Sequence, residues 1–219
     1  MCDIDCIIFG VKNLLNDIKG KRVLEVGSED INGSLRTVIE ALTPKEYVGV
    51  DIRKGPGVDI LCNVDSLVKT FGEEKFDVVI ANELLEHVRD WKTAVSNIKR
   101  VCKGGGSILI TTRSYGFKYH AFPYDFWRYE IEDIKRIFSD CEITSLERDT
   151  SAPGILLKTK KPKKFYEADL NNYELYSIVA DKRIKELTSR DLKNIKFRYR
   201  TFKVKFRALL AKQFNRVFE

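Results

Sequence analysis

Hydrophobic residues in the first 160 positions follow two alternating patterns, short continuous apolar runs and apolar residues at helical spacing. The continuous runs predict buried strands at residues 21–26, 47–51, 76–81 and 107–112. Apolar positions three or four residues apart predict helices at residues 7–18, 34–42, 65–71, 91–101 and 131–138. Cys141–Arg148 and Gly154–Lys160 predict a last pair of strands. This alternation predicts an α/β fold with helices on both faces of a mostly parallel sheet.

The loops that follow the predicted strands are the expected place for a site, because such sheets bind ligands beyond the carboxyl ends of their strands. The loop after the first strand contains Gly27 and Gly33, and glycines let a backbone turn tightly and approach a ligand. Glu25, Glu29 and Asp30 place carboxylates where a pyrophosphate would lie, which disfavours a dinucleotide. A cofactor with a cationic amino-acid end and no phosphate fits this loop better.

Four segments resemble, in order and spacing, the motifs of a known family. They read VLEVGS…NGS, YVGVDI, FDVVIANELLEHV and VCKGGGSILITT. Together they resemble class I S-adenosylmethionine-dependent methyltransferases, most closely the type 11 group, over about residues 10–160. The resemblance implies a Rossmann-like, doubly wound, mostly parallel seven-stranded sheet. It also implies S-adenosyl-L-methionine as the cofactor.

The resemblance further implies which residues contact each part of the cofactor. Asp51 ends the second predicted strand, where a carboxylate can accept hydrogen bonds from both ribose hydroxyls; the other interpretation is an exposed strand-end aspartate. Glu25 and Gly27 would contact the methionine end of the cofactor. Ser28 and Gly33 belong to the same loop. Asn63 and Val64 would contact the adenine. Asn82 and Glu83 would lie beside the sulfonium. The family usually has Asp at the position of Asn63.

The chain has only two histidines, and each follows a strand that flanks the expected methyl-transfer site. A hydroxyl acceptor needs a base for its proton, so we predict His120 as the catalytic base, with His87 as second choice. Glu86 could orient either imidazole. These side chains and Asp125 also carry metal-ligand groups, but nothing in their spacing requires a metal, and we expect none. Structural roles for both histidines stay open.

The run YHAFPYDFWRY predicts an acceptor site with an aromatic platform and a few polar groups. The predicted acceptor-binding residues are Tyr124, Asp125, Trp127 and Arg128. The alternative is an aromatic cluster over the sheet end, in which Asp125 and Arg128 form an ion pair. The run resembles the H-x-x-P-x-D-x-W-R-Y stretch of methyltransferases found among glycan and polysaccharide enzymes. That resemblance implies a sugar hydroxyl as acceptor.

Beyond residue 160 the pattern changes, and we predict two parts, a methyltransferase domain at 1–160 and a basic, mainly helical extension at 161–219. Asp169–Leu187 has helical character. Ile195, Tyr199, Phe202 and Phe206 recur on one helical face, although the alternation in this stretch also fits a strand. The net charge of +7 belongs to this part, because residues 158–219 hold 18 Lys and Arg against 7 Asp and Glu. The basic charge is therefore no argument that the core binds nucleic acid.

The composition limits where in the cell the protein is expected and which partners it could contact. The five cysteines are scattered without a C-x-x-C pair, no run reaches about 18 apolar residues, and the N-terminus lacks a basic signal region. We therefore expect a cytoplasmic protein. Residues 190–217 could dock on their own domain or a second copy, or hold the protein peripherally at an anionic membrane. A nucleic-acid contact is the less favoured alternative.

Three functions remain after these observations. The leading hypothesis is O-methylation of a sugar or glycan hydroxyl. The second is an RNA methyltransferase that binds phosphate through the basic tail. The third is a cofactor-binding fold that serves as an interaction module without turnover, since fold alone does not choose among them.

Overall fold

The computed structural model describes residues 4–31, 33–120 and 124–215. Its main element is a seven-stranded sheet with the strand order β3-β2-β1-β4-β5-β8-β7. The strands are β1 (Arg22–Val26), β2 (Glu46–Asp51), β3 (Ile60–Leu61), β4 (Phe76–Asn82), β5 (Cys102–Arg113), β7 (Glu142–Arg148) and β8 (Gly154–Lys160). The first five are parallel, whereas β8 runs antiparallel to both β5 and β7. The predicted Rossmann-like, doubly wound sheet is confirmed.

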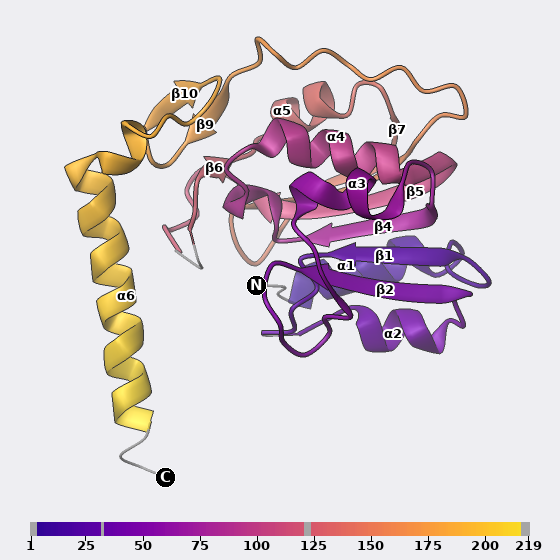
Figure 1. Ribbon diagram of the computed structural model, residues 1–219, viewed down its shortest axis with the longest axis horizontal. Coiled ribbons are helices and arrows are strands. Elements are labelled where there is room, and N and C mark those ends of the chain that lie inside the picture. The colour runs from indigo at the N-terminus through magenta and orange to yellow at the C-terminus, as the bar shows by residue number, and fades with distance from the viewer. Residues whose placement is uncertain (1–3, 32, 121–123, 216–219) are drawn as a thin grey trace.

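Helices cover both faces of this sheet (Figure 1). They are α1 (Ile4–Leu14), α2 (Arg36–Ala41), α3 (Leu67–Phe71), α4 (Trp91–Val101) and α5 (Ile131–Ile137). Successive strand residues point to opposite faces, so Val23 packs with α1 and α2 while Leu24 packs with α3, α4 and α5. The continuous apolar strands of the sequence therefore serve two cores at once.

The strand order reverses between β1 and β4, since the chain moves outward from β1 through β2 to β3 and then returns to β4. The carboxyl ends of β1, β2, β4 and β5 lie at one edge of the sheet. In register, Asn82 at the end of β4 pairs with Thr111 near the end of β5. Segments from separate parts of the sequence are thereby brought together at this edge.

The first regular element of the C-terminal extension is a β-hairpin, so the predicted helical character of Asp169–Leu187 is wrong. Strands β9 (Leu175–Ser177) and β10 (Lys182–Ile184) pair with each other, and β9 pairs antiparallel with β6 (Trp127–Arg128). Main-chain pairing with the core, rather than local helix propensity, decides this segment. The extension therefore shares a small sheet with the segment that follows β5.

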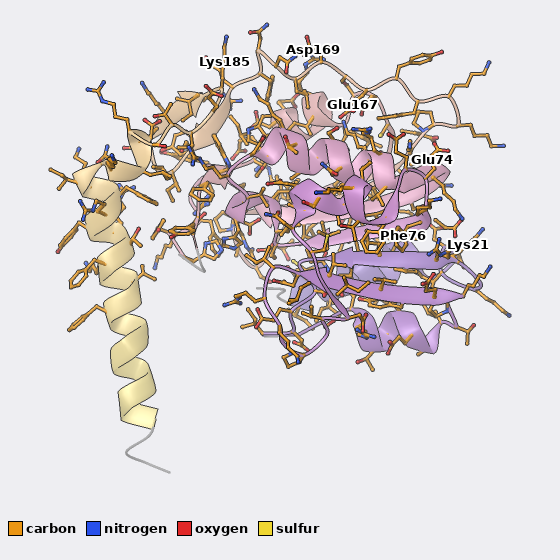
Figure 2. All side chains as sticks on the ribbon, viewed as in Figure 1. Lys21, Glu74, Phe76, Glu167, Asp169 and Lys185 are labelled. Atoms are coloured by element: carbon orange, nitrogen blue, oxygen red, sulfur yellow. The ribbon has the colours of Figure 1, made fainter. Side chains whose placement is uncertain are left out.

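The extension ends in helix α6 (Ile195–Asn215), which follows the short 3₁₀ turn η3 (Asp191–Lys193) and stands away from the sheet (Figure 1). Phe197 near its start is buried against the core, whereas Ile195, Tyr199 and Phe202 are exposed. Side chains of its first half project into open space (Figure 2). Across the described ranges, no helix has the length and apolar character that crossing a membrane requires.

Candidate functional site

A cavity of about 1160 Å³ lies at the carboxyl edge of β1, β2 and β4. This volume exceeds the roughly 300–1,000 Å³ of a pocket for one small ligand. All nine residues predicted to bind the cofactor line it: Glu25, Gly27, Ser28, Gly33, Asp51, Asn63, Val64, Asn82 and Glu83. The structure therefore brings the whole predicted set to the wall of one cavity, with room for a second molecule.

The glycine loop begins where β1 ends. Gly27 has a φ of +77°, a conformation that favours glycine, and a Cβ atom there would lie 3.1 Å from the Leu84 side chain. The backbone amides of Gly27 and Ser28 both donate to Val50 O, at 2.8 and 3.1 Å. The loop is thus tied to β2, and its side of the cavity is formed before any ligand binds.

Glu25 is the buried carboxylate on this wall. It is 4% exposed, and the Tyr47 hydroxyl donates a hydrogen bond to its Oε2 atom. Burial raises the pKa of Glu25 to about 7, because the hydrogen bond from Tyr47 offsets only part of the desolvation. A cationic group of a ligand next to Glu25 would offset the desolvation of its ionised carboxylate and so favour that form.

Asp51 lies at the end of β2 with both carboxylate oxygens toward the loops. It accepts hydrogen bonds from the backbone amides of Glu29, at 3.3 Å, and Arg53, at 3.1 Å. Each carboxylate oxygen has a second lone pair for a ligand hydroxyl. Asn63 caps the 3₁₀ turn η1 (Val64–Ser66), since its Oδ1 atom accepts from Asp65 N at 3.1 Å.

Two buried polar side chains on the cavity wall have no partner among the described residues. Both amide atoms of Asn82, which is 8% exposed, lack a hydrogen bond, and so does the hydroxyl of Ser28. Buried polar atoms are seldom left unpaired, because the loss of water is then uncompensated. These side chains therefore fit a site whose ligand supplies the missing hydrogen bonds.

A buried charge network underlies the end of β4. Arg113 forms ion pairs with Glu83 and with Asp149, whose Oδ2 atom accepts from Nη1 at 2.9 Å. Thr111 Oγ1 donates to Glu83 at 3.1 Å. The pKa of Glu83 is raised well above its ordinary value, first by burial and then by the charge of nearby Glu86. Arg113 is thus the cation that holds two buried carboxylates next to the cavity.

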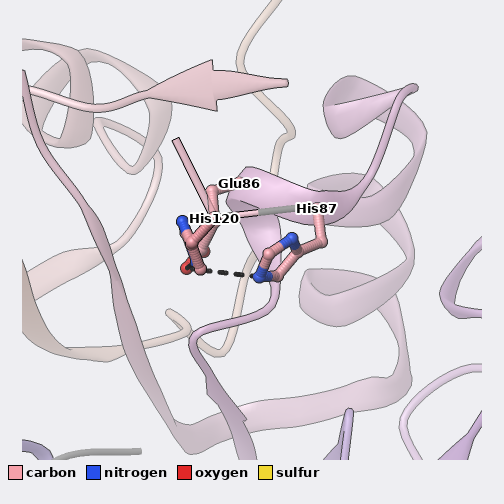
Figure 3. A group of neighbouring side chains, drawn as sticks. All are labelled: Glu86, His87 and His120. Atoms are coloured by element: carbon pink, nitrogen blue, oxygen red, sulfur yellow. Dashed lines mark ion pairs between the residues drawn. The ribbon is translucent and has the colours of Figure 1, made fainter. Parts of the chain in front are cut away.

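Both histidines and Glu86 lie next to one another (Figure 3), and the two histidines line the same cavity. The turn η2 (Leu85–His87) carries Glu86 and His87 after β4, and His120 comes from the segment after β5. His87 Nε2 and His120 Nε2 each lie 3.9 Å from Glu86 Oε1. Thr112 Oγ1 donates to the other Glu86 oxygen at 2.9 Å. We refer to Glu86, His87 and His120 as the histidine–glutamate cluster.

The residues of this cluster are among those for which the sequence offered metal-ligand groups without requiring a metal. One ligand atom from each of its three residues lies within 4.8 Å of the others. The histidines line the cavity, while Glu86 is fully buried behind them. Chemically, the cluster can bind a cation or accept a proton from a molecule in the cavity.

The structure corrects the predicted acceptor role of Asp125 and Arg128. Both are buried, and Arg128 Nη2 donates to Asp125 Oδ2 at 2.7 Å, so they form the ion pair that was the alternative. Burial raises the pKa of Asp125, but the hydrogen bond from Arg128 outweighs it and holds that pKa well below its ordinary value. Neither lines the cavity, and Asp125 Oδ2 lies 3.0 Å from His120 Nδ1. The pair positions His120.

Tyr124 and Trp127 do line the cavity, but in different ways. Tyr124 is 45% exposed and stacks on Phe126 with ring centroids 5.7 Å apart. Trp127 is fully buried, and its Nε1 donates to the backbone oxygen of Val88 at 2.9 Å. Tyr124 is therefore a partly exposed ring at the cavity, whereas Trp127 is mainly part of the packed wall.

The C-terminal extension supplies a wall that sequence reasoning missed. Its residues at the cavity are Lys185, Glu186, Leu187, Leu192, Phe197 and Val204. Arg89 fixes the segment by donating two hydrogen bonds to Leu187 O, at 3.1 and 2.7 Å. Tyr119 contacts α6 through the Phe197 ring and a 2.8 Å hydrogen bond with Thr201. No motif marks these residues, because the wall depends on long-range pairing of the hairpin.

Comparison with known sequences finds a family match across most of the chain. Residues 9–150 match the model of a methyltransferase domain. The ubiquinone biosynthesis O-methyltransferase of Hahella chejuensis is 32% identical over 108 residues, which cover 43% of this chain and 44% of that protein. The protein of the same name from Coxiella burnetii is 28% identical over 118 residues, 48% and 49% of the two chains. The similarity thus spans about half the length of these curated relatives.

Comparison with solved structures supports the same fold. A 1,6-didemethyltoxoflavin-N1-methyltransferase from Burkholderia thailandensis, solved with S-adenosylhomocysteine, has a TM-score of 0.54 at 16% identity and covers 66% of this chain and 72% of its own. An S-adenosylmethionine-dependent methyltransferase from Mesorhizobium loti has a TM-score of 0.56 at 13% identity, with coverage of 69% and 96%. At such identities the likeness concerns the fold alone.

Proposed function

The chain belongs to the methyltransferase domain family and has the class I fold of its S-adenosylmethionine-dependent members, and we propose that it methylates a hydroxyl group. The observation that carries this proposal is the histidine–glutamate cluster at the wall of the cavity that the predicted cofactor residues line. A hydroxyl must lose its proton as it attacks a methyl group, and imidazole is the side chain best suited to accept it near neutral pH. The relatives named O-methyltransferases support the same class of acceptor.

The cavity wall fits S-adenosylmethionine. Glu25 would hold the ammonium of the methionine end, Asp51 the ribose hydroxyls, and Asn82 the polar groups near the sulfonium. Asn82 is the clearest fit, because its buried amide has no partner among the described residues. The cofactor, when bound, supplies a methyl group activated by its attachment to a sulfonium. The chain's own residues must bind the cofactor and the acceptor, orient them toward each other and exclude water from the site.

The raised pKa of Glu25 predicts how cofactor binding depends on pH. Its pKa is about 7 in the ligand-free protein, and a bound ammonium favours the carboxylate. The affinity for S-adenosylhomocysteine should therefore fall about tenfold from pH 8 to pH 6, as a proton must leave Glu25 on binding. Isothermal titration in buffers of different ionisation enthalpy measures both the affinity and the proton release.

The control for this pH dependence is Glu25→Gln, which cannot titrate. It should bind more weakly at pH 8 and lose most of the slope; an equal slope in both proteins would contradict the role of Glu25. The ligand-free protein gives a second readout. Because the folded state binds the extra proton between the ordinary pKa and about 7, its stability should fall as pH rises through this window.

In the protein without a bound cation, His120 Nε2 is the atom that takes the proton of the acceptor hydroxyl. Asp125, held by Arg128, lies 3.0 Å from the opposite nitrogen of this imidazole and orients the ring. Glu86 lies 3.9 Å from both Nε2 atoms and contributes negative charge on the same side. In this proposal His120 is the base, His87 is the second candidate for that role, and Glu86 orients the two imidazoles.

A sugar or glycan hydroxyl is the acceptor class that we propose to test first. Its support is the resemblance of the run 119–129 to glycan methyltransferases, together with the exposed Tyr124 ring and the polar residues Lys185 and Glu186 on the cavity wall. An aromatic ring beside polar groups suits a sugar, which has apolar and hydroxyl-bearing faces. A phenolic hydroxyl is the second class of hydroxyl acceptor. RNA is the alternative acceptor outside these two classes.

A screen with labelled S-adenosylmethionine tests these proposals together. The full chain is incubated with glycan, phenolic and RNA fractions, with Asp51→Ala as the control that should bind cofactor poorly. Alkali-stable label in a glycan or phenolic fraction supports O-methylation. Label in RNA would favour the nucleic-acid alternative. Cofactor binding without transfer to any fraction would favour the non-catalytic module and contradict the proposal.

A further inference from the structure

We propose that Glu86, His87 and His120 bind a divalent metal ion at the wall of the cavity. Their metal-ligand atoms already lie within 4.8 Å of one another, although they come from segments after two different strands. Two imidazoles and one carboxylate on one side of an ion are a known ligand set for catalytic metals, which keep their other positions open. The open side faces the cavity, because both histidines line it.

Both histidines are oriented for metal binding through Nε2. His87 Nδ1 contacts the backbone oxygen of Tyr124, which can only accept a hydrogen bond, so Nδ1 carries the proton and Nε2 is free to bind. His120 Nδ1 lies 3.0 Å from Asp125 Oδ2, and Arg128 holds that carboxylate from behind. A carboxylate behind a metal-binding imidazole is the usual arrangement that fixes its ring.

Glu86 is the observation that points most directly to a cation. Its side chain is fully buried, and Oε1 accepts no hydrogen bond within the described part of the chain. Thr112 binds the other oxygen, which leaves Oε1 directed at the two Nε2 atoms. A buried carboxylate oxygen without a donor is costly, and a metal ion between Oε1 and the imidazoles would remove that cost.

The ligand atoms must move closer together to hold one ion. Bonds of about 2.0–2.2 Å to zinc place neighbouring ligand atoms roughly 3.3 Å apart in tetrahedral geometry. The two Nε2 atoms lie 3.9 Å from Glu86 Oε1, so each of these two distances must shorten by about half an ångström. The widest separation among the three ligand atoms is within 4.8 Å and must shorten by up to about 1.5 Å. The set of two nitrogens and one oxygen suits Zn²⁺ and its first-row neighbours better than Mg²⁺ or Ca²⁺, which prefer oxygen ligands.

The role of the ion rests on the proposed function, whereas its binding does not. Methyl transfer breaks the carbon–sulfur bond with its electrons going to sulfur, and forms the oxygen–methyl bond. With the ion bound, the acceptor hydroxyl would bind to the open side, where the ion lowers its pKa and the proton leaves to solvent water. No electron is transferred, so a redox-inert ion such as Zn²⁺ is sufficient.

The test is direct metal binding by the full chain after removal of metals with a chelator. Titration with Zn²⁺ should give one site per chain, and Co²⁺ should give visible absorption bands typical of nitrogen and oxygen ligands. The double variant His87→Gln, His120→Gln should abolish this site. Asp125→Asn, which changes the residue behind His120 and also loosens its ion pair with Arg128, should weaken binding about 10–100-fold in protein whose circular dichroism is unchanged.

Controls separate this site from adventitious binding and from misfolding. Cys141→Ser removes the partly exposed thiol and should leave Zn²⁺ binding unchanged. Glu86→Gln keeps the size of the buried side chain and should weaken binding at least tenfold, while circular dichroism reports the fold. Equal Zn²⁺ binding by the chelator-treated chain and the double variant would overturn the inference.

Activity distinguishes failure of this inference from failure of the proposed function. Once an acceptor is known, the chelator-treated protein should turn over at least tenfold more slowly and recover with Zn²⁺. Full turnover in the presence of chelator would leave O-methylation intact and overturn the metal. A single Zn²⁺ site in a protein that methylates no hydroxyl would support the metal site and contradict O-methylation.

Discussion

His120→Ala is expected to lower kcat about 10²–10⁴-fold on a hydroxyl acceptor, the range typical for loss of a group that removes a proton. The same change should leave the affinity for S-adenosylhomocysteine within about twofold, because the residues predicted to bind the cofactor lie on other segments of the cavity wall. His120 is the residue that connects the Asp125–Arg128 pair to the cluster. Its loss removes the base and, where an ion is bound, one of the three ligands.

The measurements for His120→Ala are single-turnover methyl transfer and calorimetric cofactor binding. Lys118→Ala is the matched control, because Lys118 is exposed in the same segment and its side chain is not part of the cavity wall. It should keep the rate of the unchanged protein. If His120→Ala lost cofactor binding as much as turnover, the residue would be structural, and the catalytic assignment would fail.

Arg113→Met is expected to destabilise the protein by about 3–5 kcal/mol, the usual cost of breaking a buried ion pair by removing one partner. Arg113 is 3% exposed and faces two buried carboxylates, Glu83 and Asp149. Methionine fills the volume but leaves both carboxylates without this cation. The free energy of unfolding in urea at pH 7 measures the effect.

Arg148→Met is the control for this prediction, since both residues end strands and both pair with carboxylates. Arg148 is 61% exposed and Glu130 is 37% exposed, so their ion pair is screened by solvent. Its loss should cost less than about 1 kcal/mol. Equal destabilisation by the two substitutions would show that burial does not determine the importance of the Arg113 network.

The fold, and the meeting of the nine predicted cofactor residues at one cavity, were predictable from the sequence for a specific reason. Buried parallel strands require continuous apolar runs, and their ends are marked by polar residues such as Asp51 and Asn82. Because these strand ends meet at one edge, the position of a residue in the sequence fixes its place on the cavity wall. The predicted cofactor residues could therefore be placed without knowledge of side-chain geometry.

The roles of Asp125 and Arg128 could not be decided in the same way. Residues three apart in an irregular segment can face a ligand or each other, and only the burial of both side chains settles the choice. The hairpin of β9 and β10 was missed because its strands are three residues long and pair with a strand far away in sequence. Their short, mixed sequence carries no alternating pattern that distinguishes strand from helix.

The cavity wall formed by the C-terminal extension has an evolutionary consequence. The nine residues predicted to bind the cofactor lie within residues 25–83, whereas the same cavity is also lined by residues between 185 and 204, which follow the last strand of the main sheet. Mutations in the extension can therefore reshape part of the cavity without changing the predicted cofactor-binding residues. Related chains that keep the domain but differ in this extension should diverge first in what they methylate, and only later in how they hold the methyl donor.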